Sequence, residues 1–435
     1  MTELWFALSA WLQDLLLLAG LLLPLLLVGW LCLRGYRLWP LLGGLLRRHA
    51  VLSLTFTLLI AISVGNGDVF IAQERGLREG SARSAEKFDM IVAAPGSEMT
   101  VMLASVYLEP TALPLLDGEI YDLVDSHEQV ALAAPLAFGD SYEGAPVVGT
   151  TADFVEYLSD GLASGRMFET IEEAIIGARV ALDIGDRFEP VHGDGSQGVL
   201  DEHGAVLEVV GTMPMTGSPW DQAILVPVEQ VWDVHALPIG HGPDWDGTLG
   251  PPFDPANFPG TPAILVRADT LWANYSLRSE FTTDRTMAFF PGTVLAGLHA
   301  LMGDVRQVMS VLAVTSQVLV AVGVLAGLSM LTRLLARRLA LLRALGAPSR
   351  FIFALTWSFA TLLIAGGAVL GLLLGIVTTV VISNIVSEQT DILVTARLGW
   401  RELHLVAGFV SLTGLLSLLP AALATRRPVE ADLRA

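Results

Sequence analysis

The sequence predicts an α-helical membrane domain of five transmembrane helices with a large α/β domain inserted outside the membrane. Three observations predict it: five long apolar stretches, a polar block between the second and the third, and arginines gathered on the other side. A bilayer core takes roughly 20 apolar residues as a helix, the default form because backbone polar groups cannot go unpaired in lipid. The predicted spans are Leu15–Leu33, His49–Gly67, Val308–Leu331, Phe351–Val386 and Leu403–Thr425.

The arginines predict the orientation of these spans, because short arginine-rich loops stay in the cytoplasm. They lie between the first two spans, between the third and fourth, and after the fifth, as Arg34, Arg37, Arg47, Arg48, Arg333, Arg337, Arg338, Arg343, Arg350, Arg426, Arg427 and Arg434. We therefore expect a multi-pass protein of the inner (cytoplasmic) membrane. Its N-terminus lies outside and its C-terminus inside.

Four segments follow from this topology. Residues 1–33 are an extra N-terminal transmembrane helix, and residues 34–67 are a basic cytoplasmic segment and the second transmembrane helix. Residues 68–305 are the periplasmic domain. Residues 306–435 hold three transmembrane helices and a cytoplasmic loop at 332–350.

The block 68–305 is strongly acidic. It holds 37 acidic and 10 basic side chains, a charge of −27, whereas the whole chain carries −19. Such a surface repels nucleic acid, so no nucleic-acid partner is expected. It favours cations or basic partners, although solubility alone is the simpler explanation.

The same block has the pattern of a mixed α/β domain. Short apolar runs bounded by Gly, Pro or charge predict strands, and helical spacing predicts helices. The predicted strands are Phe88–Ala94, Gln129–Pro135, Pro146–Thr150, Ala205–Thr212, Gln222–Pro227 and Thr261–Val266. The predicted helices are Met99–Tyr107, Glu119–Val124 and Ala152–Leu158. The Pro- and Gly-rich stretch Pro238–Pro262 is predicted to be a long loop.

The sequence gives no sign of an enzyme. A P-loop needs a Gly-x-x-x-x-Gly-Lys-Ser/Thr motif, but the only lysine is Lys87, preceded by Ser84-Ala85-Glu86. No Gly-x-Ser-x-Gly or His-Glu-x-x-His motif is present either. Any ATP-driven work is therefore expected to depend on a separate subunit.

The cytoplasmic loop carries the clearest motif, Arg337-Arg338-Leu339-Ala340-Leu341-Leu342-Arg343-Ala344-Leu345-Gly346-Ala347. Helical spacing places Leu341, Leu342 and Leu345 on one face, and Gly346 can end the helix in a left-handed conformation. The motif is consistent with an ordinary basic juxtamembrane helix. It is equally consistent with a coupling helix that docks into a groove of a cytoplasmic partner.

This motif resembles the signature of the FtsX-like permease domain of ABC transporters of the MacB/FtsX class. That family typically reads Arg-Glu-Ile-x-x-Leu-Arg-Ala-Leu-Gly-Ala. The chain matches at Arg337 and at 342–347 and departs at Arg338, where the family has Glu. Leu45–Gly67 is similar to the family's entry helix, and Phe88–Ser97 to the start of its outer domain. The resemblance covers most of the chain from residue 40 onward, and the extra N-terminal span departs from the usual four-span plan.

The resemblance implies a permease subunit that works as a homodimer with a cytoplasmic ABC ATPase, which supplies the energy of ATP. The residues implied in ATPase coupling are Arg337, Arg338, Leu341, Leu342, Arg343, Leu345 and Gly346. A periplasmic binding or adaptor protein and membrane lipid are further expected partners. The alternatives for the work done are metal or metal-chelate handling, lipid or lipoprotein extraction, tripartite efflux, and a non-transporting scaffold for a cell-wall enzyme.

Small residues recur in the fourth predicted span, at Gly367, Gly371 and Gly375. Such spacing lets two membrane helices approach closely, although Gly is common in membrane helices in general. We expect a helix-packing surface here, within one chain or across a homodimer.

Four histidines of the acidic block are candidate metal ligands: His192, His203, His235 and His241. Imidazole and carboxylate are ligands that zinc and related divalent ions accept. The spacings match no strong zinc signature, and a lone loop histidine is usually only solvated. The sequence thus suggests a zinc or other divalent-metal site without specifying its ligands.

Overall fold

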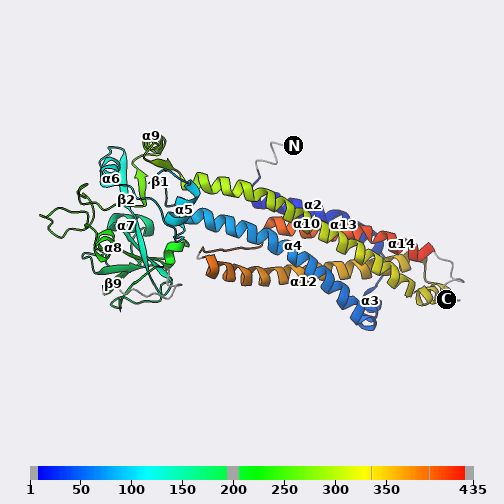
Figure 1. Ribbon diagram of the computed structural model, residues 1–435. Helices are drawn as coiled ribbons and strands as arrows, with labels where there is room; N and C mark the ends of the chain where they lie inside the picture. Colours follow the sequence, from blue (N-terminus) through cyan, green and yellow to red (C-terminus); the bar gives the residue numbers. More distant parts are fainter. Residues whose placement is uncertain (1–7, 194–204, 335, 391, 427–435) are drawn as a thin grey trace. The chain divides into compact units, whose positions relative to one another are not determined.

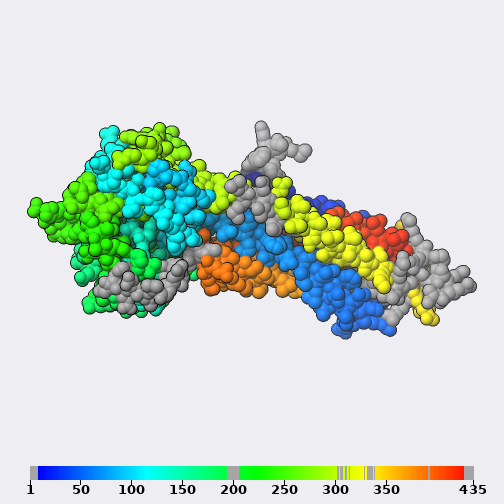
Figure 2. All heavy atoms as spheres, viewed as in Figure 1, coloured from blue at the N-terminus to red at the C-terminus, as the bar shows by residue number. Residues whose placement is uncertain are grey.

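The computed structural model describes residues 8–193, 205–334, 336–390 and 392–426 of the chain. These residues divide into a helical unit, which comprises the described residues up to 76 together with 304–384 and 395 onward, and an α/β unit of 77–303 and 385–394. Figure 1 draws the two units and labels many of their elements, and Figure 2 shows their heavy atoms. The periplasmic domain predicted at 68–305 thus differs from the observed α/β unit, since residues 68–76 continue a helix of the helical unit.

Three helices, α4, α10 and α12, have residues in both units. Apolar side chains of eight helices and the connecting segments form a single core in the helical unit. The helices and their bounds are α2 Ala10–Leu33, α3 Trp39–Arg48, α4 Ala50–Ser84, α10 Pro291–Leu334, α11 Ala336–Ala344, α12 Ser349–Thr390, α13 Trp400–Leu416 and α14 Leu418–Arg426.

Among the residues that the structure describes, four helical stretches are long and apolar enough to cross a membrane. They are Ala10–Leu33, Ala50–Ser84, Ser349–Gln389 and Trp400–Thr425, and they contain or overlap four of the five predicted spans. The remaining predicted span, Val308–Leu331, lies within α10. The apolar stretch found there, Val314–Gly327, is shorter than the other four. The count of five spans and their orientation therefore stay predictions.

The N-terminal helix α2 packs along α13. An added Cβ at Gly414 would lie 2.6 Å from Leu25 Cδ1, so the two helices approach closely at this point. His404 Nε2 lies 2.8 Å from the backbone oxygen of Asp14, within hydrogen-bond distance. The extra helix is therefore an integrated part of the helical unit.

The α/β unit is built on two sheets. The first has strand order β12-β1-β11-β2, and the second has the order β5-β9-β6-β10-β4-β3-β8, with β7 also paired to β9. The strands are β1 Met90–Ala93, β2 Val130–Pro135, β3 Ala137–Tyr142, β4 Ala145–Thr150, β5 Ser164–Gly165, β6 Glu173–Ile176, β7 Arg187–Phe188, β8 Val191–His192, β9 Leu207–Thr212, β10 Ile224–Pro227, β11 Ala263–Ala268 and β12 Met287–Phe289. The helices are α5 Glu98–Val106, α6 Gly118–Asp125, α7 Ala152–Ser159, α8 Val228–Val234 and α9 Ala273–Glu280.

The predicted elements of this unit are confirmed, each with shifted ends. Each of the six predicted strand segments overlaps a strand, namely β1, β2, β4, β9, β10 and β11, and the three predicted helices correspond to α5, α6 and α7. The segment 238–262 contains no helix and no strand, as predicted, and it forms part of the green surface of this unit in Figure 2. The remaining strands were not predicted, and two of them, β3 and β8, carry the candidate site.

Candidate functional site: a histidine–carboxylate cluster and a capped helix

A β-bulge in β3 brings the first residue of the cluster into place. The register of β3 against β4 shifts between Phe138 and Asp140, so Gly139 is the extra residue of the bulge. Bulges bend a strand and re-aim its side chains, and they are common beside functional sites. On the other edge of β3, Asp140 stands directly opposite His192 of β8. The two side chains are therefore cross-strand neighbours.

The third residue, His235, is the C-terminal cap of α8, which follows β10 directly. Its Nδ1 lies 2.7 Å from the backbone oxygen of Val231, one turn earlier. A Cβ added at Gly139 would lie 3.2 Å from His235 Nε2, tighter than ordinary van der Waals contact. The bulge residue thus has to be small for the imidazole to reach the cluster.

Three potential ligand atoms face one another in this cluster. His192 Nδ1 lies 3.3 Å from Asp140 Oδ1 and 3.3 Å from His235 Nε2, and His235 Nε2 lies 3.8 Å from Asp140 Oδ1. The Asp140 side chain is 1% exposed, whereas those of His235 and His192 are 24% and 54% exposed. The cluster therefore has a buried carboxyl group beneath an accessible imidazole edge, and the three atoms are close enough to share one metal ion.

A pocket of about 670 Å³ opens beside the cluster. Asp140, His192 and the backbone around Gly139 form part of its wall. Tyr107 and Gln389 line it farther along. A small molecule or ion in this pocket would lie beside His192, the most exposed member of the cluster.

The four predicted histidines have different surroundings. His192 and His235 lie together, whereas His241 pairs with the buried Glu229 at 3.2 Å and stacks on Trp245 with ring centroids 4.8 Å apart. Glu229 also accepts the backbone N–H of Gly250 at 2.6 Å, so this pair ties the loop after α8 to the helix. His203 lies outside the described residues. Asp140 was missed, because the run that contains it has no alternation that predicts a strand.

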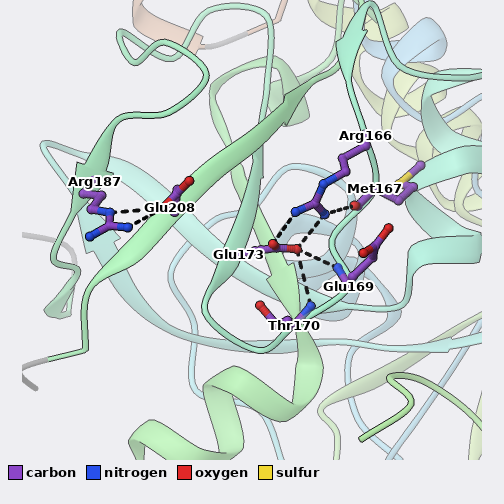
Figure 3. Close-up of polar contacts among 7 residues, drawn as sticks. All are labelled: Arg166, Met167, Glu169, Thr170, Glu173, Arg187 and Glu208. Atoms are coloured by element: carbon purple, nitrogen blue, oxygen red, sulfur yellow. Dashed lines mark hydrogen bonds and ion pairs between the residues drawn. The ribbon is translucent and has the colours of Figure 1, made fainter.

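Charged side chains elsewhere in the second sheet form closed pairs. In Figure 3, Glu173 accepts hydrogen bonds from the Arg166 guanidinium and from the backbone N–H of Glu169, at 2.7 Å for the latter. Hydrogen bonds from Arg166 hold the pKa of Glu173 well below its usual value, at about 2. Arg187 and Glu208 pair across β7 and β9 at 2.7 Å. These contacts connect strand ends and offer no converging ligand set.

In the helical unit, the helix of the predicted coupling motif ends in a Schellman cap. Gly346 has φ +98°, its N–H donates to the Arg343 oxygen at 3.0 Å, and the Ala347 N–H donates to the Leu342 oxygen at 2.9 Å. This pair of bonds satisfies the last carbonyls of α11 and fixes where the helix stops. The left-handed glycine expected from the sequence is confirmed.

The exposed side of α11 carries a short apolar stripe. Leu341 and Leu345 are 50% and 85% exposed, and the exposed Arg337 lies one turn before Leu341 on the same side. The prediction that Leu342 shares this face is wrong: Leu342 packs, partly buried, against the core that contains Leu339, because positions i and i+1 of a helix diverge by about 100°. Arg343 is partly buried, and the side chain of Arg338 is outside the described residues.

The three glycines of α12 lie against α4 of the same chain. A Cβ at Gly367 would lie 2.7 Å from that of Ile60, and one at Gly371 would lie 2.8 Å from the Ala61 oxygen. At Gly375 the nearest atom is Asp68 Cβ, at 3.5 Å. This surface is occupied within one chain, so a second copy would need another face.

No family model matches the sequence, and no curated protein matches it. Several solved structures, including the following two, resemble part of the chain in fold. One is the periplasmic region of MacB from Actinobacillus actinomycetemcomitans, at 10% identity and a TM-score of 0.31, covering 50% of this chain and 95% of that one. The other is the extracellular domain of the noncanonic ABC-type transporter YknZ from Gram-positive bacteria, at 11% identity and a TM-score of 0.29, covering 46% and 98%.

Proposed function

We propose that this chain is the membrane-spanning permease subunit of a MacB/FtsX-like ABC transporter. In this proposal a partner ATPase binds at α11, and ATP hydrolysis there moves the α/β unit. The observation that carries the proposal is the stripe of Arg337, Leu341 and Leu345, left exposed on a capped helix whose sequence resembles the coupling segment of that family.

The stripe has the chemistry of a docking surface. Two leucines one turn apart expose apolar area that gains free energy only when a partner covers it, and a basic residue at one end adds charge selectivity. The Schellman cap makes the helix end rigid, so a push on the stripe is transmitted rather than absorbed by fraying. Leu339 and Ala340, on the opposite side, are buried and anchor α11 in the core.

The other predicted cytoplasmic segment shares that core. Leu38 and Leu42, before and within α3, are buried in the same apolar cluster as Leu339. Tyr36 packs edge-on against Phe351 of α12, with ring centroids 5.5 Å apart. A force applied to either segment would therefore act on one packed body, which suits a machine driven from the cytoplasm.

The energy source in this proposal is a separate chain. Lys87, the only lysine, is not part of a P-loop, and it pairs with Asp160 at 2.5 Å in the α/β unit. Three continuous helices, α4, α10 and α12, have residues in both units and supply the mechanical connection. An intact helix resists bending, so displacement at one end can produce displacement at the other.

The test is association with the ATPase. The variant Leu345→Asp places a charge in the most exposed position of the stripe, and we expect it to lower co-purification of the ATPase and permease-dependent ATP hydrolysis by about tenfold or more. Leu123→Asp is the matched control, because Leu123 is an exposed leucine on α6 of the α/β unit, and it should leave both unchanged. Unaltered ATPase binding and hydrolysis in Leu345→Asp would overturn the proposal.

A further inference from the structure

We propose that Asp140, His192 and His235 bind one divalent transition-metal ion, with zinc as the best fit. Binding itself is independent of the permease role. The further step, that the ion or its complex is the cargo of the transporter, rests on the proposed function and names its substrate class. Three features support the site: the distances between its ligand atoms, the tautomer of one imidazole, and the backbone that holds the ligands.

The separations between the three ligand atoms match a tetrahedral ion. Zinc binds nitrogen and carboxylate oxygen at about 2.0–2.2 Å, and the corners of such a tetrahedron are about 3.3–3.6 Å apart. The observed separations are 3.3, 3.3 and 3.8 Å. An ion can therefore be accommodated with shifts of a few tenths of an ångström. A set of two imidazoles and one carboxylate also favours zinc, because calcium and magnesium prefer oxygen ligands alone.

The tautomer of His235 is set for coordination. The Nδ1 atom of His235 lies 2.7 Å from the Val231 carbonyl oxygen, which can only accept, so a hydrogen bond here requires the proton on Nδ1. In the neutral ring this leaves a lone pair on Nε2, directed toward His192 and Asp140. A backbone carbonyl that holds the far nitrogen of a metal-binding histidine is the usual supporting contact in such sites. His192 contributes Nδ1 once its proton resides on Nε2.

The backbone holds two of the three ligands in place before any ion arrives. Asp140 and His192 are fixed opposite each other by β3–β8 pairing, and the Gly193 N–H donates to the Gly139 oxygen at 2.8 Å. The Ser141 hydroxyl donates to the Gly193 oxygen at 2.6 Å and closes the turn after β8. Preorganised ligands raise metal affinity because little conformational freedom is lost on binding.

The surroundings favour an exchangeable ion over a permanently buried one. His192 is 54% exposed, and it lies with Asp140 in the wall of the 670 Å³ pocket. The charge of −27 on the residues 68–305 attracts cations toward this surface. A site that is preformed, open and in an acidic field suits capture and release, which is what a transporter requires of a cargo site.

Metal binding by the purified full-length chain tests the proposal. Chelator-treated protein in detergent is dialysed against Zn²⁺ and its metal content is measured, and Co²⁺ is titrated separately because tetrahedral Co²⁺ absorbs visible light strongly. We expect about one ion per chain and a tetrahedral Co²⁺ spectrum. His192→Gln and Asp140→Asn should each weaken binding by about 100-fold or more.

Two controls make the result decisive. His127→Gln alters a histidine that also faces a carboxylate, Glu280 at 3.3 Å, but lies outside the cluster, so it should bind metal as the wild type does. Because His192 is exposed on a two-residue strand, His192→Gln should fold even if Asp140→Asn does not. Absence of stoichiometric metal in the wild type, or wild-type affinity in folded His192→Gln, would overturn the site. Leu345→Asp should bind metal normally, which separates failure of the site from failure of the permease proposal.

Discussion

Two fully buried carboxylates of the helical unit have opposite surroundings. Glu402, in α13, accepts from Arg75 at 2.8 Å and from the Gly399 N–H at 2.7 Å. Asp68, seven residues before Arg75 on α4, has no hydrogen-bond partner for either oxygen among the residues that the structure describes. Burial alone therefore does not define the role of a carboxylate, whereas its hydrogen-bond and charge partners do. Glu402 connects two helices, whereas burial of the Asp68 carboxyl without a described partner costs folding free energy in the same helical unit.

The difference matters because the two residues lie on helices that the proposed mechanism would move together. Arg75 also donates to the Arg397 oxygen at 2.6 Å, so the ion pair ties α4 to the segment leading into α13 as well as to α13 itself. Around Asp68, α4 contacts α12 through close packing, and Gly375 of α12 lies beside the Asp68 side chain. At Arg75, α4 is thus held by charge and hydrogen bonds, whereas at Asp68 it is held by close packing against α12.

The largest expected effect is from breaking the ion pair. Glu402→Gln removes the charge that compensates Arg75 and should destabilise the helical unit by about 3–5 kcal/mol, as for other buried pairs that lose one partner. The measurement is thermal or denaturant unfolding in detergent. The double variant Arg75→Leu with Glu402→Leu should recover most of the loss, because it leaves no unpaired charge. Equal stability of wild type and Glu402→Gln would contradict the structural role of the pair.

Packing between α4 and α12 should give the next largest effect. Gly371→Ala places a methyl group 2.8 Å from the Ala61 oxygen, and overpacking of this kind costs about 1–3 kcal/mol. Gly366→Ala is the matched control on the same helix, because nothing lies within 4 Å of its added Cβ. It should be neutral or slightly stabilising. If both variants behaved alike, α4 would be held by the ion pair alone, and the contrast between its two parts would disappear.

The sequence predicted the elements of this molecule better than the sites they form. Apolar periodicity and glycine or proline boundaries are local signals, and they predicted β1, β4 and α7 correctly. Asp140 and His192 are 52 residues apart and meet only through the pairing of β3 with a two-residue strand, which no local pattern specifies. Residue type alone nevertheless predicted His192 and His235 as candidate metal ligands.

The same limit applies to the length of helix α4. The predicted span ended at Gly67, because Asp68 is charged and the sequence beyond it is polar. In the structure α4 continues to Ser84, and Asp68 is buried by neighbouring helices that the local sequence cannot reveal. Likewise, the helical period of α11 was evident, but the direction in which Leu342 points depends on the core beneath it.

The smallest expected effect returns to Asp68. Because this carboxylate has no described partner to lose, Asp68→Asn removes a desolvation cost and little else, so stability should change by less than about 1 kcal/mol and should rise rather than fall. Asn keeps the shape of the side chain, so packing against Gly375 is preserved. Unfolding measured beside Glu402→Gln gives the comparison directly. A loss as large as that of Glu402→Gln would show that Asp68 also holds a compensating group, and the contrast between the two carboxylates would then be wrong.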